Sequence, residues 1–95
     1  MFIVLLKFSE NKAMAVDFME GHNLWIKRGF DDGVFILVGS LQPGLGGSVV
    51  AYNVSKSELE NRVNEDPFVE QGIVTAEILE IDPKKADKRL EFLLS

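Results

Sequence analysis

His22 is the only histidine in the 95-residue chain, and histidine is the side chain best suited to move protons near neutral pH. The sequence predicts a helix over Lys12–Arg28. Because positions three and four apart share a helix face, His22 lies on an apolar face formed by Phe18, Met19, Trp25 and Ile26. Residues on such a face point into the core or into a pocket beneath it. One interpretation is a buried histidine bonded to a backbone carbonyl, and the other is a general acid or base.

A second candidate lies far along the chain, at Asp66-Pro67-Phe68. Asp66 reads as a helix N-cap followed by proline at the first helical position, which accounts for it as a structural residue. A carboxylate held by cap geometry could also bind one imidazole nitrogen of His22 and fix its tautomer, leaving the other nitrogen free to act on a substrate. The functional interpretation therefore predicts a hydrogen bond of roughly 2.6–3.2 Å between the two residues.

Composition excludes several kinds of protein. The chain has no cysteine, so disulfides and thiolate metal sites are impossible, and the nearby Asp17 and Glu20 lie off the His22 face; we expect no metal and no cofactor. The net charge is −5, and the one basic cluster, near the C-terminus, is interleaved with acidic residues, which argues against nucleic-acid binding. The apolar start Met1–Leu6 is too short for a signal peptide or a membrane span, so we expect a cytoplasmic protein with no membrane contact.

The order of predicted elements indicates the fold class. Apolar runs predict four strands, at Phe2–Phe8, Val34–Val38, Ser48–Val54 and Ile73–Ile81. The first helix is expected to begin at an Asn11 cap and end at Gly29, and a capping box at 55–58 opens a second that runs to Val63. A short helical turn from Asp66 ends at Gly72, and a final helix is expected over Lys84–Leu94. This β-α-β-β-α-β order plus a C-terminal helix predicts an α+β, ferredoxin-like single domain, with a core at 1–81 and a helical extension at 82–95.

The faces of the predicted antiparallel sheet bear on assembly. Phe2–Phe8 and Val34–Val38 are apolar at consecutive positions, which is typical of strands covered on both faces. Two helices cover one face, so a monomer would expose a large apolar patch on the other. We expect a homodimer or higher homo-oligomer formed through the sheets. In the alternative, the final helix folds back over that face with a stripe of Ala86, Leu90, Leu93 and Leu94.

The loop at 39–47 contains four glycines and Pro43 but no phosphate-binding pattern. Its glycines are expected to serve tight turns. Backbone amides and Ser40 could alternatively line a small anion pocket.

Several segments of the chain resemble the YCII-related (YciI-like) proteins. They are the opening strand, Gly21-His22-Asn23-Leu24, Val38-Gly39-Ser40-Leu41, Gly46-Gly47-Ser48-Val49 and the run from Asn64 to Gly72 that contains Asp66-Pro67-Phe68. The resemblance covers most of residues 1–81. It implies a dimeric α+β barrel and an active site built on a His-Asp pair, which maps onto His22 and Asp66. Some relatives are dehydrochlorinase-like lyases, and the substrate does not carry over because the loop at 39–47 is short here.

Three functions follow for one scaffold. The first is a small enzyme, a lyase or isomerase, in which His22 and Asp66 transfer protons on a small, polar, conjugated acid. Ser40 would then hold the substrate's carboxylate, and Trp25 and Phe68 would wall the ligand pocket. The second is a non-catalytic module that binds a small molecule or regulates a partner. The third is a barrel related to cofactor-free monooxygenases, and fold alone does not choose among them.

Overall fold

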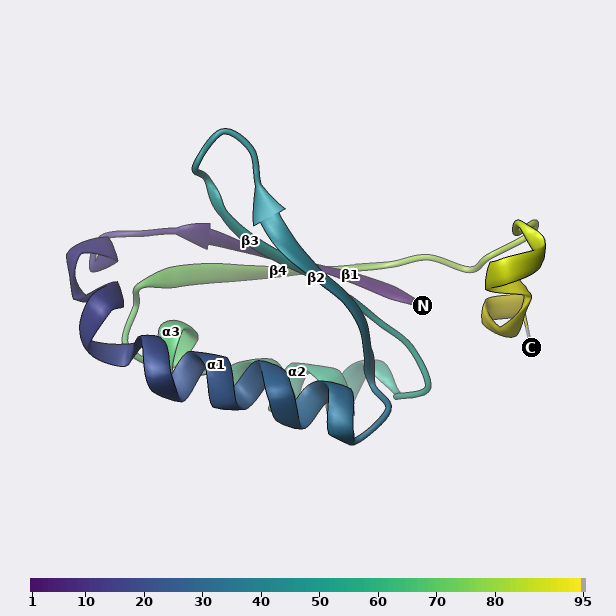
Figure 1. Cartoon of the computed structure of the whole chain (residues 1–95), viewed down its shortest axis with the longest axis horizontal. Helices are drawn as coiled ribbons and strands as arrows, with labels where there is room; N and C mark the ends of the chain where they lie inside the picture. Colours follow the sequence, from purple (N-terminus) through teal and green to yellow (C-terminus); the bar gives the residue numbers. More distant parts are fainter. Residues whose placement is uncertain (95) are drawn as a thin grey trace.

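A computed structural model describes residues 1–94, and it is built on a four-stranded antiparallel sheet. The strands are β1 (Phe2–Phe8), β2 (Phe35–Leu41), β3 (Gly46–Ala51) and β4 (Val74–Glu80), in the order β2-β3-β1-β4 (Figure 1). The two central strands, β1 and β3, are therefore far apart in sequence, as in the ferredoxin-like pattern. The predicted fold class is confirmed.

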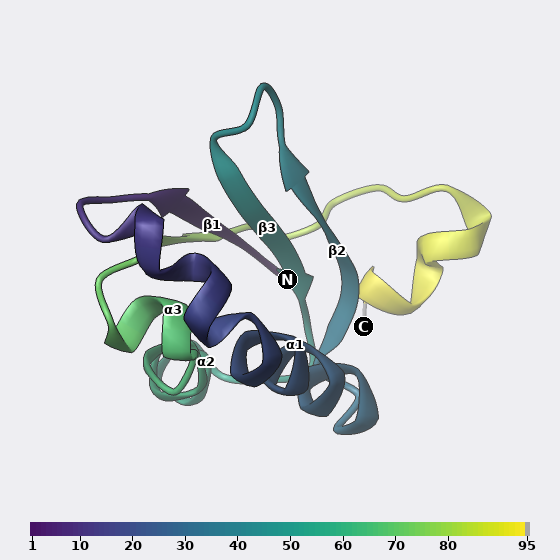
Figure 2. The same cartoon turned by 60° about the vertical axis from the view of Figure 1, so that its left-hand side comes forward.

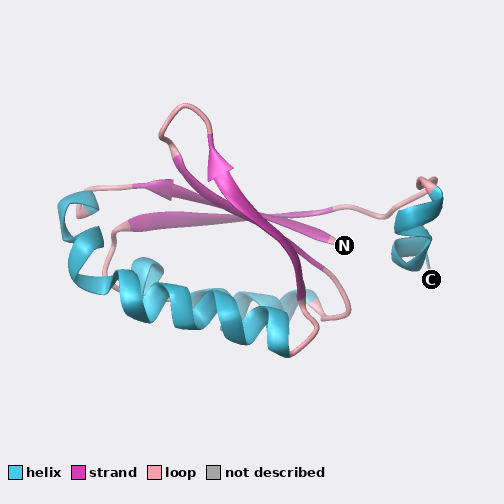
Figure 3. Ribbon diagram, viewed as in Figure 1, coloured by secondary structure: helices cyan, strands magenta, loops and turns pink. Residues whose placement is uncertain are grey.

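The helices between β1 and β4 pack on one face of this sheet, as Figure 3 shows. They are α1 (Ala15–Asp31), preceded by the 3-10 turn η1 (Lys12–Met14), then α2 (Lys56–Asn64) and the single-turn α3 (Pro67–Glu70). The predicted capping box opens α2: the Ser55 hydroxyl accepts from the Glu58 amide, and the Glu58 carboxylate accepts from the Ser55 amide. The short α3 lies beside α1, far from it in sequence.

The sheet is not buried on both faces within one chain. In β1, Phe2, Val4 and Leu6 are buried toward the helices, whereas Ile3 and the other residues of the opposite face are only half-buried or exposed. Register places Leu37, Val50 and Leu79 in the same row as Ile3 on this opposite face, which we call the open face. Leu37 is 61% exposed. The face that the helices leave uncovered therefore exposes apolar residues in the isolated chain, as expected for a monomer.

Both predicted ends of the first helix are wrong. Asn11 makes no side-chain cap; instead its Nδ2 donates to the Gln71 carbonyl at 2.8 Å and ties the start of the helix to the end of α3. Gly29 lies inside α1 and is buried. It packs so closely against β2 that a Cβ there would stand 2.0 Å from the Phe35 ring. The chain turns at Gly33 instead, where φ is +72°. Gly29 therefore serves close helix–sheet packing, a role that sequence spacing cannot distinguish from a cap.

The predicted C-terminal helix is also wrong in extent and position. Residues 81–87 form no helix, and η2 (Lys88–Leu94) is a 3-10 helix. Figures 1 and 2 show this segment extending past the end of the sheet and away from α1 and α2. Its contact with the domain includes the Phe92 ring, edge-on to Tyr52 with ring centroids 5.2 Å apart. It does not fold back over the open face, and Ser95, the last residue of the predicted extension, lies outside the described residues.

The packing at Gly29 gives a stability prediction. Gly29→Ala should destabilise the protein by about 1–3 kcal/mol, because a methyl group must displace the buried Phe35 ring. Chemical unfolding would measure the change, with the exposed Arg28→Ala on the same helix as the control. Combining Gly29→Ala with Phe35→Leu should cost less than the sum of the two single changes, because Leu vacates the contested space. Strict additivity would contradict this account.

Candidate functional site

The two candidate residues, His22 and Asp66, meet between α1 and α3. Nδ1 of His22 lies 2.8 Å from Oδ1 of Asp66, within the distance expected from the sequence. Asp66 is the N-cap of α3, and its Oδ1 also accepts from the Phe68 amide at 3.0 Å. A single oxygen atom thus caps α3 and binds the ring from α1. The structural and functional interpretations of Asp66 are both satisfied by the same geometry.

Asp66 is the only buried polar or charged residue of the described chain, with no exposed surface. Its second oxygen, Oδ2, is buried without a hydrogen-bond partner among residues 1–94. A buried carboxylate is costly unless it is paired, and the ion pair recorded for it in the described chain is the one with His22. An acceptor-only carboxylate at Nδ1 requires that this nitrogen carry the proton. The tautomer is therefore set, and Nε2 is the ring nitrogen left for a ligand.

Phe68 holds the same ring from a different side. The rings of His22 and Phe68 stack with centroids 3.9 Å apart and planes 4° from parallel. Phe68 is buried, and its backbone amide is the one that binds Asp66. One residue therefore fixes both partners of the pair, the carboxylate through its main chain and the imidazole through its side chain.

The distance between the two helices at this point depends on Gly21. A Cβ at Gly21 would lie 3.2 Å from Cγ of Pro67, closer than most Cβ contacts. Gly21 precedes His22, and Pro67 follows Asp66, so this close contact lies beside the pair. The glycine thus permits the short His22–Asp66 contact, a role that the sequence analysis did not assign.

Trp25 contributes to the site mainly from the core. It is 2% exposed, its indole Nε1 donates to the Arg62 carbonyl at 2.8 Å, and its ring meets Phe35 edge-on. The centroid of its ring lies 6.0 Å from that of His22. Trp25 therefore supports the histidine from behind and links α1 to α2.

A pocket of about 390 Å³ opens beside the His22 ring, between α1 and the helix-facing side of β1, β2 and β3. Volumes of this size accommodate small organic ligands. The expected pocket residues Ser40, Trp25 and Phe68 all line it with His22. The other lining residues are mostly apolar: Leu6, Phe8, Met19, Asn23, Ile26, Val38, Gly39, Gly46, Gly47, Ser48, Val49 and Val74.

The glycines of the hairpin do more than make turns. Gly44 has a positive φ in the turn as expected, but Gly39 and Gly47 lie within β2 and β3 and line the pocket. Register places Gly47 between Ser40 and Leu6 in one row of the helix-facing side. A side chain there would enter the pocket, where the nearest atom to its Cβ is the Gly39 carbonyl oxygen at 3.4 Å. The sequence analysis missed Gly47 and Asn23; the register of the β2–β3 hairpin is the signal that would have found Gly47.

Within residues 1–94, no group of three or more His, Asp or Glu side chains is arranged to hold a metal ion. No helix in the described part of the chain has the length and apolar character needed to cross a bilayer.

Comparison with known proteins adds one structural likeness. No family model and no curated protein matches the sequence. Among solved structures, 5-chloro-2-hydroxyhydroquinone dehydrochlorinase (TftG) from Burkholderia phenoliruptrix AC1100, in complex with 2,5-dihydroxybenzoquinone, superposes with a TM-score of 0.69. The match covers 94% of this chain and 98% of that one at 14% identity. It supports the fold assignment alone.

The shared oxygen of Asp66 makes Asp66→Asn an informative change. The amide oxygen can still accept from Phe68 and His22, so α3 should keep its cap, while the amide nitrogen would be buried in place of Oδ2 without a partner. We expect a loss of about 1–3 kcal/mol in the free energy of unfolding. Ring ¹⁵N shifts of His22, the only histidine, should change from the Nδ1–H tautomer toward a mixture of tautomers. An unchanged tautomer would mean that the carboxylate does not control the ring.

Proposed function

We propose that His22 and Asp66 form a general acid/base pair in a small enzyme of the lyase or isomerase class, with dehydrochlorinase-like chemistry on a small conjugated acid. The observation that carries the proposal is the placement of one ring: its Nδ1 is held by a buried carboxylate, and the same ring lines a pocket of about 390 Å³. A histidine oriented in this way presents a free nitrogen to a ligand, which is the arrangement that general acid/base catalysis requires.

The pocket also favours this function over a non-catalytic module. A histidine that served only the core would be packed dry against the sheet, with both nitrogens bonded to protein. Here the His22 side chain keeps 14% of its surface exposed, and only one nitrogen has a protein partner in the described chain. The His22 ring therefore faces a space that a small molecule can enter.

The chemistry follows from the single free nitrogen. Nε2 removes a proton from a hydroxyl group of the conjugated substrate, and the electron pair moves into the ring or chain of double bonds. The imidazolium then returns that proton to carbon, which completes an isomerisation in which no atom is lost. If the protonated carbon carries chloride, Nε2, which is free again, takes a proton from a second hydroxyl group. The electron pair then expels chloride into solution, and the net reaction is elimination of HCl. Asp66 stays ionised throughout and stabilises the imidazolium.

The structural neighbour indicates the class to test first. TftG is named a dehydrochlorinase of a chlorinated hydroxyhydroquinone, and its structure holds a dihydroxybenzoquinone. We also propose that this chain is a YciI-like protein. The motif segments that carry that resemblance contribute His22, Ser40, Gly47 and Asp66 to a single site.

We further propose that the active form is a homodimer or a higher homo-oligomer in the cytoplasm, paired through the open face. Leu37 and Leu79 are 61% and 42% exposed there, in a row with Ile3 and Val50. Contiguous apolar patches on a sheet favour burial against a partner. Because the pocket lies on the helix-facing side, such pairing would leave its lining residues in place.

The catalytic role predicts a specific loss of activity. Incubation with 5-chloro-2-hydroxyhydroquinone in D₂O without oxygen should accelerate chloride release or deuterium uptake at ring carbon. His22→Asn and Asp66→Asn should each lower the rate by about 10²-fold or more, because each removes a member of the proton-transfer pair. Chloride measurement and proton NMR provide the two readouts, and prior chelation should not change the rate.

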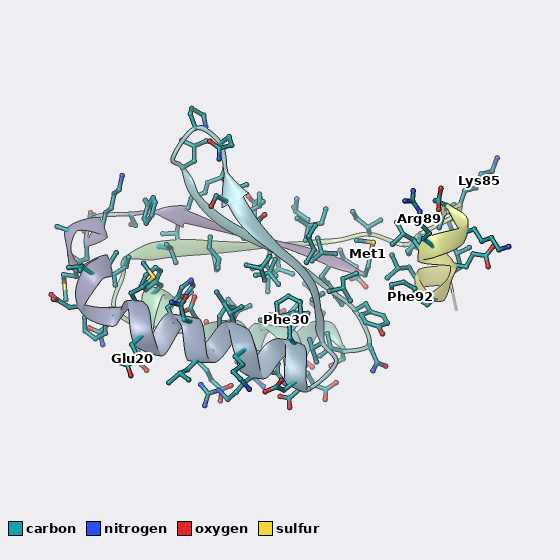
Figure 4. The ribbon with its side chains drawn as sticks, in the orientation of Figure 1. Met1, Glu20, Phe30, Lys85, Arg89 and Phe92 are labelled. Carbon is teal, nitrogen blue, oxygen red and sulfur yellow. The ribbon has the colours of Figure 1, made fainter. Side chains whose placement is uncertain are left out.

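Glu20→Gln is the matched control. It removes one negative charge from the same helix as His22, but its side chain points away from the sheet into solvent, as Figure 4 shows. It should keep the full rate. No acceleration of either process by the wild-type protein would contradict the proposed chemistry. Oxygen consumption that depends on His22 would favour the monooxygenase-like alternative.

The assembly predicts a change of mass on mutation. Light scattering should give at least twice the 10.6 kDa of one chain. Leu37→Asp should reduce the mass to that of the monomer, because it places a charge at the most exposed position of the apolar row. Lys56→Asp, at an exposed position on the helical side, is the control and should not change the mass. A monomeric wild-type protein over micromolar to millimolar concentrations would rule out the dimer.

A further inference from the structure

We infer that the pocket beside His22 selects hydroxylated conjugated rings that are uncharged when they enter, and that it rejects ligands carrying a carboxylate. The inference rests on the proposed function in one respect, that this pocket is the ligand site. It narrows the class of substrate from a conjugated acid of any kind to one whose acidic proton lies on a hydroxyl group. It also replaces the expectation that Ser40 holds a substrate carboxylate.

The first step is the charge of the lining. None of the sixteen residues that line the pocket is lysine, arginine, aspartate or glutamate. His22 is the one lining residue with an ionisable side chain, and its Nδ1 is already bonded to Asp66. The polar side chains Asn23, Ser40 and Ser48 are neutral hydrogen-bonding groups, and the first two lie at the exposed margin. Such a lining can orient a hydroxyl group but has no permanent cation to offer an anion.

The second step is the cost of placing a carboxylate there. An ionised carboxylate loses its hydration on entry, and without a cation this loss is not offset. The buried Asp66 charge beside His22 adds like-charge repulsion, and the net charge of −5 disfavours the approach of anions. A neutral hydroxyl group incurs neither penalty. Its proton reaches Nε2 only after binding, and the resulting anion then lies beside the imidazolium that the transfer creates.

The third step concerns the nearest cations. Lys7 lies on the open face of the sheet, on the side away from the pocket, because its register partners Gly46 and Thr75 alternate with the helix-facing residues. Lys12 is closer: its Nζ lies 4.6 Å from the centre of the Phe8 ring, and Phe8 lines the pocket. Lys12 is not itself a lining residue, and the ring contact accounts for its position. Because Lys12 contacts a lining residue, its movement could give a carboxylate a partner.

The fourth step is the space available. The apolar walls formed by Leu6, Phe8 and Val38 suit the faces of a flat ring, and a volume of about 390 Å³ exceeds what a single ring requires. The absence of a side chain at Gly47 opens the floor next to Ser40. A ring with hydroxyl groups at opposite ends could contact both His22 and Ser40.

The test compares matched ligands on the full chain. Near pH 7, hydroquinone is neutral, whereas 4-hydroxybenzoate and benzoate carry an ionised carboxylate. Amide shifts of Ser40 and Gly47 and ring shifts of His22 would report binding at the site. Hydroquinone should bind at least about tenfold more tightly than 4-hydroxybenzoate. Gly47→Val should weaken hydroquinone binding by a similar factor, and Thr75→Val on the open face should leave it unchanged. Gly47→Ala replaces the valine variant if that variant does not fold.

The possible outcomes distinguish the inference about ligand charge from the catalytic proposal. Equal or tighter binding of 4-hydroxybenzoate at these residues would overturn the inference, and loss of that binding in Lys12→Gln would identify Lys12 as the group that recognises the carboxylate. Failure of all three ligands to bind at millimolar concentrations would also overturn it. Preference for hydroquinone without any turnover would leave the inference standing and count against the catalytic proposal alone. Turnover without a preference for hydroquinone would support the catalytic proposal and overturn the inference about ligand charge.

Discussion

The buried Asp66 carboxylate is the interaction on which the site depends. Its Oδ1 accepts from the Phe68 amide and from His22, so a helix cap and an interhelical bond share one atom. Removing the carboxylate would affect the start of α3, the contact of α1 with α3 and the orientation of the ring together. Structural and catalytic requirements on Asp66 therefore cannot be separated by position, only by changes such as Asp to Asn that keep shape and alter charge.

The hydrogen bond between His22 and Asp66 is short because the segments around it are closely packed. Gly21 permits α1 to approach Pro67, and Phe68 stacks on the ring while its amide holds the carboxylate. On the opposite wall, the absence of a side chain at Gly47 leaves room where a larger residue would fill the space between α1 and the sheet. The missing side chain therefore has a different effect at each glycine. At Gly21 it lets two helices come into close contact, and at Gly47 it leaves open space in the pocket.

The sequence predicted those features that depend on local chemistry. The capping box at Ser55, the cap at Asp66 and the order of elements along the chain follow from hydrogen-bonding groups and periodicity within a few residues. Predictions from the sequence failed where contacts between distant segments determine the structure. Gly29 resembles a helix end but lies beneath Phe35, and Asn11 resembles a cap but bonds to Gln71, sixty residues away. The fold of α1 onto α3 also could not be read from the spacing of His22 and Asp66. The resemblance to a family, and not the spacing, brought the two residues together.

The division of the sheet into two faces explains how a chain this small can combine a site with an apolar surface. Alternation along β1 sends Val4 and Leu6 toward the helices and Ile3 and Leu5 toward the open face, so substitutions on one face leave the lining of the other in place. The helix-facing side has a core on one part and a pocket on the other, because α1 and the hairpin diverge where Gly47 lies. The open face carries no group with acid/base chemistry in the row of Ile3, Leu37, Val50 and Leu79, and its exposed apolar area is suited to packing. Catalysis and assembly thus draw on alternate residues of the same strands, and a one-residue slip of register would exchange their positions and abolish both.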